Sequence, residues 1–169
     1  MEGGSVFTFG LNLYHQLGQT PVVENSPLPK QMNLKPLKGK SISGVCVGRF
    51  HSVVWTPDSV FTVGFNAGQL GHQKGEKFLS QLRQVSYLRH TDIGIARVAC
   101  SDAATVCLTT KGDVFVLHEY NCRKIVSKGQ DIDKVLVTGG NLDHSVDIGI
   151  LTEKGGEELS VMMKNESGQ

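Results

Sequence analysis

Histidine and cysteine are the residue types in this chain that could carry catalysis or hold a metal. His51 and His144 stand in matching His-Ser-Val contexts, each directly before a β-rich stretch. A general base or a metal ligand in such a place needs a cysteine, a carboxylate or a further histidine at a suitable spacing. Neither histidine has that companion, so we expect each ring to bridge neighbouring strands by hydrogen bonds. The remaining histidines fall in expected loops, where we expect solvated rings: His15, His72, His90 and His118.

The four cysteines raise two other possibilities, disulfide formation and thiolate reactivity. No pair has C-x-x-C spacing, and we expect Cys46, Cys100 and Cys107 to be small core side chains in a reducing compartment, not a disulfide framework. Cys122 lies in the basic stretch Asn121-Cys122-Arg123-Lys124, where positive charge can lower a thiol pKa. An ordinary exposed thiol is the alternative at that position.

The remaining catalytic motifs are incomplete. Gly139-Gly140 follows an expected strand, but no Gly-Lys-Ser/Thr completes a phosphate-binding loop. Ser52 and Ser101-Asp102 lack the Gly-x-Ser-x-Gly context or an ordered triad. The sequence therefore predicts a protein that is not an enzyme, with no catalytic residues, no cofactor and no metal site.

An internal repeat of 54 residues is the dominant pattern, since Phe7, Phe61 and Phe115 are spaced by that interval. A period of this size is typical of propellers and solenoids, in which one unit packs its apolar face on the next unit. The first copy reads Val-Phe-Thr-Phe-Gly-Leu-Asn followed by Gln-Leu-Gly; the second reads Val-Phe-Thr-Val-Gly-Phe-Asn followed by Gln-Leu-Gly. The third copy keeps Val-Phe-Val-Leu and loses the Gln-Leu-Gly.

The same interval relates Cys46 to Cys100 and His51 to Thr105. At this spacing Thr105 replaces His51 in the second copy, so the position does not demand imidazole chemistry. The repeats are expected at residues 1–57, 58–111 and 112–169, and the third is degenerate.

Each repeat is expected to form four short strands, which in the first copy cover residues 6–9, 29–32, 42–47 and 51–56. Glycine, at 20 residues, and asparagine provide the turns, because they suit backbone positions with positive φ or Asx-turns. No long apolar period of 3.6 residues is present, and the stretch 76–90 is expected to be a loop and a strand, not a helix. The expected structural turn residues are Gly10, Asn12, Gly18, Gly64, Asn66 and Gly71.

Charge and hydropathy exclude several partner classes. The chain has 17 basic and 16 acidic residues, so its net charge is +1. This balance disfavours a nucleic-acid or chromatin reader and a polybasic membrane surface. No apolar run approaches the ~20 residues of a membrane span, and no secretory signal opens the chain. We expect no nucleic-acid partner, no direct membrane insertion and a cytoplasmic protein, with the nucleus as a second location.

The ordered pattern Val-Phe-Thr-x-Gly-x-Asn, Gln-Leu-Gly and Val-x-Val-Gly-Arg-Phe-His-Ser-Val resembles the repeats of the regulator of chromosome condensation family. It covers residues 6–111 strongly and 112–169 weakly. The resemblance implies an all-β fold: a partial β-propeller of about three blades of four-stranded antiparallel sheets, the third degenerate. Because propellers close with about four to eight blades, we expect further blades or self-association at the two open ends.

A closer resemblance, to a family member that regulates a kinase, is carried by Gly48-Arg49-Phe50-His51, by residues 103–107 and by residues 134–140. It implies a non-catalytic protein-interaction module that binds and inhibits a cytosolic Tec-family (Bruton-type) tyrosine kinase. Two alternatives stay open: a guanine-nucleotide exchange factor for a Ran-like GTPase, and a purely structural fragment of a larger propeller.

Arginine and aromatic residues at loop ends are the candidates for a protein interface, because these types are favoured as interface anchors. Phe50 is expected instead to fill the space between blades. The candidate interface residues are Tyr14, Arg49, Phe65, Tyr87 and Arg97.

Overall fold

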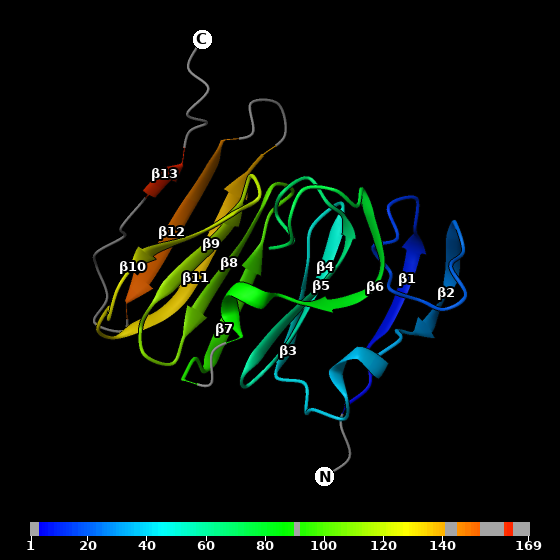
Figure 1. Cartoon of the computed structure of the whole chain (residues 1–169), viewed down its shortest axis with the longest axis horizontal. Helices are drawn as coiled ribbons and strands as arrows, with labels where there is room; N and C mark the ends of the chain where they lie inside the picture. Colours follow the sequence, from blue (N-terminus) through cyan, green and yellow to red (C-terminus); the bar gives the residue numbers. More distant parts are fainter. Residues whose placement is uncertain (1–3, 90–91, 141–144, 153–160, 164–169) are drawn as a thin grey trace.

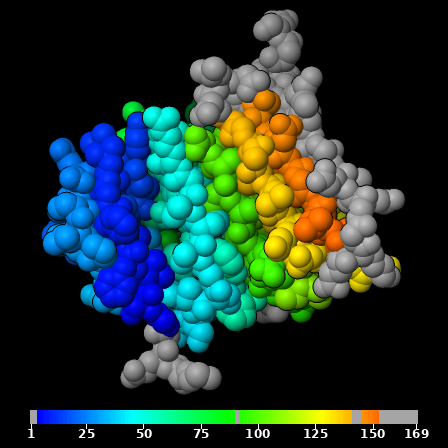
Figure 2. All heavy atoms as spheres, turned by 180° about the vertical axis from the view of Figure 1, so that it is seen from behind, coloured from blue at the N-terminus to red at the C-terminus, as the bar shows by residue number. Residues whose placement is uncertain are grey.

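Antiparallel β-strands, joined by loops and turns, are almost the only regular elements of the described chain (Figure 1). The computed structural model describes residues 4–89, 92–140, 145–152 and 161–163. Its strands form four sheets, which we name A to D in chain order. The space-filling view shows the sheets following one another across the molecule in that order (Figure 2).

Sheets B and C are complete four-stranded units, and every neighbouring pair in them is antiparallel. Each strand hydrogen-bonds to the next one in the chain. Sheet B consists of β3 (Gly44–Val47), β4 (His51–Thr56), β5 (Ser59–Phe65) and β6 (Phe78–Gln84). Sheet C consists of β7 (Ile95–Cys100), β8 (Ala104–Thr109), β9 (Val114–His118) and β10 (Asn121–Val126).

The two end sheets have fewer strands in the described part of the chain. Sheet A pairs β1 (Phe7–Leu11) with β2 (Asn25–Gln31). Sheet D contains β11 (Ile132–Gly139), β12 (Val146–Thr152) and β13 (Val161–Met163). Two short 3₁₀ helices, η1 (Lys35–Leu37) and η2 (Ser86–Leu88), complete the described elements. The prediction of an all-β, partial propeller of four-stranded antiparallel sheets is confirmed, and the stretch 76–90 holds β6 and η2.

The sequence repeats and the sheets are out of phase. The expected repeat ends at residues 57 and 111 fall in the turns of the β4–β5 and β8–β9 hairpins. Each complete sheet therefore takes two strands from one sequence copy and two from the next. This sharing ties successive copies together through backbone hydrogen bonds as well as side-chain packing.

The apolar core of the described chain lies between the sheets. Side chains of a strand point alternately to its two faces, so Val53 and Val54 of β4 enter different clusters. Val106 and Cys107 of β8 divide in the same way. The cluster between A and B includes Met32 and Phe61, and the cluster between B and C includes Val60 and Val98. The cluster between C and D includes Val116 and Ile148.

Sheet A leaves an apolar surface exposed at one end of the molecule. Phe7 and Phe9 of β1 are 61% and 64% exposed, whereas Phe61 and Val63, one period later, are 3% and 0% exposed. The later pair is covered by the neighbouring sheet. The difference arises because β1 has no sheet on its outer side within the described residues.

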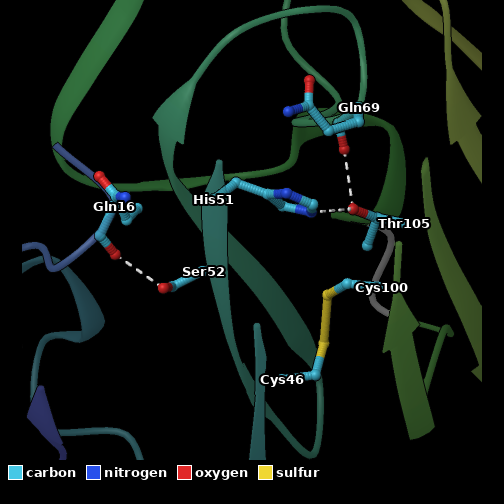
Figure 3. Close-up of a disulfide and its surroundings, with 7 residues drawn as sticks. All are labelled: Gln16, Cys46, His51, Ser52, Gln69, Cys100 and Thr105. Carbon is cyan, nitrogen blue, oxygen red and sulfur yellow. Dashed lines mark hydrogen bonds between the residues drawn. A yellow bond between two sulfur atoms is a disulfide. The ribbon is translucent and has the colours of Figure 1, made fainter. Parts of the chain in front are cut away.

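Two side-chain hydroxyl groups form equivalent hydrogen bonds between consecutive sheets (Figure 3). Ser52 Oγ donates to the Gln16 carbonyl at 2.7 Å, and Thr105 Oγ1 donates to the Gln69 carbonyl at 2.8 Å. Thr105 therefore corresponds to Ser52 in the structure, and the sequence-based match of Thr105 with His51 is wrong. The offset arises because the β8–β9 turn is one residue longer than the β4–β5 turn.

The third copy replaces the glycine-rich loop with a tight turn. His118 pairs with Asn121 across the β9–β10 hairpin, and the two residues between them, Glu119 and Tyr120, have φ of 49° and 63°. Two consecutive positive φ values match the two-residue hairpin turns that suit strand twist. The Tyr120 hydroxyl donates to the Asn66 carbonyl at 3.0 Å, so this turn packs directly on the loop of sheet B.

Cys46 and Cys100 form a disulfide between sheets B and C (Figure 3). The expectation of two reduced core cysteines is therefore wrong. The two positions lie on β3 and β7, the equivalent edge strands of neighbouring sheets, and their Cα atoms are 6.3 Å apart. That separation is within the range that a disulfide spans.

We expect the Cys46→Ser variant to lose about 4 kcal/mol of unfolding free energy under non-reducing conditions, because the bond closes a loop of 54 residues in the unfolded chain. Urea denaturation of the wild type and the variant measures this difference, which should vanish once a reductant is added. The matched control is Cys122→Ser, since Cys122 is a free cysteine. Recovery of alkylated Cys46 and Cys100 from the non-reduced native protein would contradict the assignment.

Candidate functional site

A cluster of aromatic rings lies where sheets A and B meet, at the ends of their strands. Tyr14 comes from the loop after β1, Phe50 from the β3–β4 turn, Phe65 from the end of β5 and Phe78 from the start of β6. The ring centroids of Tyr14 and Phe50 are 4.9 Å apart, and those of Phe65 and Phe78 are 5.6 Å apart. Tyr14 also contacts Phe65 at 5.7 Å. We call these four residues the aromatic rim.

The aromatic rim is half-buried and held mainly by edge-to-face contacts. All four rings have intermediate exposure. The Tyr14 and Phe50 planes meet at 83°, a geometry that the ring quadrupoles favour. The His15 ring packs on Phe78 at 5.3 Å and extends the cluster. A partly exposed aromatic surface that is already packed loses little side-chain entropy when a partner covers it.

Asparagine and glutamine side chains hold the loop that carries Tyr14 in one conformation by hydrogen bonds to its backbone. Asn12 is 2% exposed; its Oδ1 accepts the Leu17 N–H at 2.9 Å, and its Nδ2 donates to the Val23 carbonyl at 2.6 Å. Gln16 Oε1 accepts the Tyr14 N–H at 3.0 Å. These bonds replace regular secondary structure, so the loop has a defined conformation.

The second copy builds its loop with the same residue types. Asn66 is 4% exposed and donates to the carbonyls of Gln73 and Glu76, each at 3.2 Å. Gln69 Oε1 accepts the Ala67 N–H at 2.8 Å. Gly64, one residue before the end of β5, precedes this loop with φ of 123°, and a Cβ there would lie 2.4 Å from the Phe50 carbonyl oxygen. The other predicted turn glycines also have positive φ: Gly10, Gly18 and Gly71.

Arg49 adds a cation to the exposed side of the aromatic rim. Its guanidinium carbon lies 5.2 Å from the centre of the Phe50 ring, within cation–π range. Its backbone N–H donates to Asp102 Oδ1 at 3.1 Å, and its carbonyl accepts from Gln16 Nε2 at 3.5 Å. The turn that carries Arg49 and Phe50 is thereby bonded to both neighbouring sheets.

The predicted interface residues divide into two groups. Tyr14, Arg49 and Phe65 come together at the aromatic rim. Tyr87, half exposed on η2, lines a separate pocket of about 420 Å³ with His72 and Arg83. Arg97 lies on β7, where its Nε donates to the Asp133 carbonyl at 3.0 Å and its side chain pairs with the Asp133 carboxylate.

The sequence patterns do not predict Phe78 or His15 as interface residues, and they predict only an inter-blade packing role for Phe50. The signal available for Phe50 was its place beside Arg49 in the Gly-Arg-Phe-His turn. No sequence pattern links Phe78 to Tyr14, because the two meet only through the packing of sheet A on sheet B.

His51 bridges two sheets, as expected, through a buried hydrogen bond (Figure 3). Thr105 gives its hydroxyl hydrogen to Gln69, so its oxygen accepts from His51 Nε2 at 3.1 Å. This assigns the Nε2–H tautomer, and Nδ1 has no partner in the described part of the chain. Burial lowers the pKa of His51 to about 4, against a smaller opposing effect of Asp102. The ring is fully buried and stays neutral above about pH 4, so its hydrogen bond joins sheet B to sheet C inside the protein.

Two other histidines, His72 and His118, differ from the expectation of solvated loop residues. His72 bonds Thr62 Oγ1 through Nε2 at 2.9 Å, and burial lowers its pKa to about 4. His118 belongs to β9 and is 6% exposed. His90 and His144 lie outside the described residues.

Neither free cysteine is activated. Burial raises the pKa of Cys122 to about 11, so the hypothesis that nearby Arg123 and Lys124 lower it is wrong. The thiol is half-buried on β10, on the face of sheet C that packs toward sheet B. Cys107 is fully buried, and its pKa is raised for the same reason.

The described residues hold no group of three or more histidine, cysteine, aspartate or glutamate side chains arranged to bind a metal. In the same part of the chain, no helix has the length and apolar character that a bilayer crossing requires.

Comparison with known proteins relates the chain to a repeat family. The model of the regulator of chromosome condensation (RCC1) repeat matches residues 3–55. Two relatives named "Inhibitor of Bruton tyrosine kinase", from Xenopus laevis and Homo sapiens, are 50% and 46% identical over 99% of this chain. The chain spans about 13% of the length of each of them.

Among solved structures, Prp20p from Saccharomyces cerevisiae superimposes with a TM-score of 0.72. The match covers 99% of this chain and 42% of Prp20p, at 16% identity. At that identity the likeness supports the fold alone.

We expect the stability of the protein to fall as the pH is lowered from about 6.5 to about 4. In this window the unfolded state protonates His51 while the folded state, with its lowered pKa, does not. The contribution of neutral His51 to the free energy of unfolding is fully present above the pKa of His51 in the unfolded chain. By pH 4 this contribution has fallen by about 3 kcal/mol. Urea denaturation at a series of pH values measures the slope.

The His51→Gln variant should show a smaller pH slope than the wild type, whatever its stability at neutral pH. His72→Gln serves as a second variant, because His72 titrates in the same direction. An unchanged slope in His51→Gln would show that the histidine is not the group that titrates.

Proposed function

The chain belongs to the regulator of chromosome condensation (RCC1) repeat family, and on this basis we propose that it is a non-catalytic module that binds and inhibits a Bruton-type tyrosine kinase. The relatives that match nearly the whole chain are named as inhibitors of that kinase. Their names concern proteins of which this chain spans a small part, so the kinase enters here as a proposed partner. We place this activity in the cytoplasm, with the nucleus as a second location.

The aromatic rim beside Arg49 is the observation that carries the proposal. Tyrosine and arginine are the residue types most enriched among interface residues that dominate binding energy. Here they stand on a loop and a turn that side-chain hydrogen bonds already hold in place. Such a surface can bind a folded partner without first ordering a flexible segment.

Inhibition by this surface requires no chemistry on the propeller side. The rim would cover a membrane-binding or regulatory surface of the kinase, so that bound kinase is occluded. The non-catalytic assignment is supported by the neutral, buried His51 and by free cysteines whose pKa values are raised.

The exposed apolar end of sheet A supports a second part of the proposal, that further blades cover this surface in a longer protein. The exposed Phe7 and Phe9 occupy positions that are buried one period later. The expected repeat limits, 1–57, 58–111 and 112–169, remain our proposal for the units of the chain, with strands shared between them.

We expect Arg49→Ala to weaken binding to full-length Bruton tyrosine kinase roughly tenfold or more, because it removes a central cationic anchor. Calorimetric titration of the chain into the kinase measures the affinity, and a kinase assay at saturating chain measures inhibition. Arg49 is exposed, so its substitution leaves the core intact.

The matched control is Arg97→Ala, which removes an exposed arginine from β7, outside the aromatic rim. It should bind as the wild type does. If both variants bound the kinase equally weakly, the net charge of the chain, and not the aromatic rim, would explain the loss of affinity. Absence of binding by the wild type, together with accelerated nucleotide release from a Ran-like GTPase, would instead favour the exchange-factor alternative.

A further inference from the structure

A basic groove lies on the opposite rim of the molecule from the aromatic rim. It runs between η1 and the start of β5, and its volume is about 420 Å³. The groove lies near Thr56, the end of β4 that is remote from His51 and the aromatic rim. Three cations line it: Lys38, Lys40 and Arg89.

One of the three cations is already neutralised. Lys40 Nζ lies 3.1 and 3.0 Å from the two carboxylate oxygens of Asp58, the one acidic residue in the lining. Hydrogen bonds from Thr56 and Lys40 lower the pKa of Asp58, so this carboxylate stays ionised and continues to hold Lys40. The pair also bonds Ser59, which is 1% exposed at the base of the groove.

The other two cations differ from Lys40. Within the described residues, neither the Lys38 ammonium nor the Arg89 guanidinium is paired with a carboxylate. Both residues are exposed, and both line the groove. The groove therefore carries two uncompensated positive charges in a chain whose net charge is only +1.

The base of the groove is held in one conformation. Gln84 Nε2 donates to Ser59 Oγ at 3.0 Å, which connects the end of β6 to the start of β5. Lys38 has φ of 52°, and its N–H donates to the Lys35 carbonyl as the cap of η1. Arg89 caps η2 in the same way, because its N–H donates to the Ser86 carbonyl, so both unpaired cations stand on hydrogen-bonded backbone.

We propose that this groove binds an acidic peptide segment of a protein partner, with carboxylates paired to Lys38 and Arg89. Arginine can hold a carboxylate with two parallel hydrogen bonds, and lysine supplies a mobile point charge. The balance of 17 basic and 16 acidic residues disfavours a nucleic-acid ligand, which needs many phosphate contacts. The groove is separate from the aromatic rim, so peptide binding there can be tested independently of kinase binding.

The test is binding of a fluorescein-labelled peptide of alternating glutamate and glycine, eight residues long, to the whole chain by fluorescence anisotropy. The Lys38→Ala/Arg89→Ala double variant should bind at least tenfold more weakly than the wild type. The wild-type affinity should also fall as the salt concentration rises. A circular-dichroism melt establishes that each variant is folded.

The matched control is Lys111→Ala/Lys134→Ala, which changes the net charge by the same amount at exposed positions outside the groove. It should bind within twofold of the wild type. Equal weakening in the two double variants would overturn the proposal, because binding would then follow net charge alone. Absence of peptide binding by the wild type, or tighter binding of a single-stranded oligonucleotide than of the peptide, would also overturn it.

Discussion

Packing of each β-sheet on the next one is the interaction on which the rest of this structure depends. The apolar clusters lie between sheets, so no sheet here buries its own faces alone. The hydroxyl groups of Ser52 and Thr105 repeat the same hydrogen bond across successive contacts, and the Cys46–Cys100 disulfide joins the second of them. Covalent, polar and apolar interactions therefore act at one boundary. Phe7 and Phe9 of sheet A are exposed, whereas the residues one period later, Phe61 and Val63, are buried by such a contact between sheets.

The aromatic rim is a consequence of the same packing. The loop of sheet A meets the strand ends of sheet B, and this brings Tyr14 against Phe50 and Phe65. The rings complete the contact between the sheets and also remain partly exposed. A surface with both roles is rigid before a partner arrives, because moving it would disturb the sheet contact.

The two rims of the molecule present different chemistry although they belong to the same repeats. The rim at the His51 end of β4 carries aromatic rings and Arg49, whereas the rim at the Thr56 end carries the basic groove around Lys38 and Arg89. Overall charge near zero conceals this difference, since it averages over the whole surface. A near-neutral repeat protein can therefore offer an apolar contact and an electrostatic contact that do not compete for space.

Short-range patterns in the sequence were sufficient to determine the all-β class and the loops built on Asn12 and Asn66, because alternation and turn residues act over a few positions. The 54-residue repeat is equally a property of the sequence, since the same residue types recur at that interval. Tertiary structure alone decided the Cys46–Cys100 bond, the burial of Cys122 and the correspondence of Thr105 with Ser52. One extra residue in a hairpin turn shifts that correspondence, and a fixed period cannot register the shift. The aromatic rim likewise combines four distant segments, and only the packing of sheet on sheet brings them into contact.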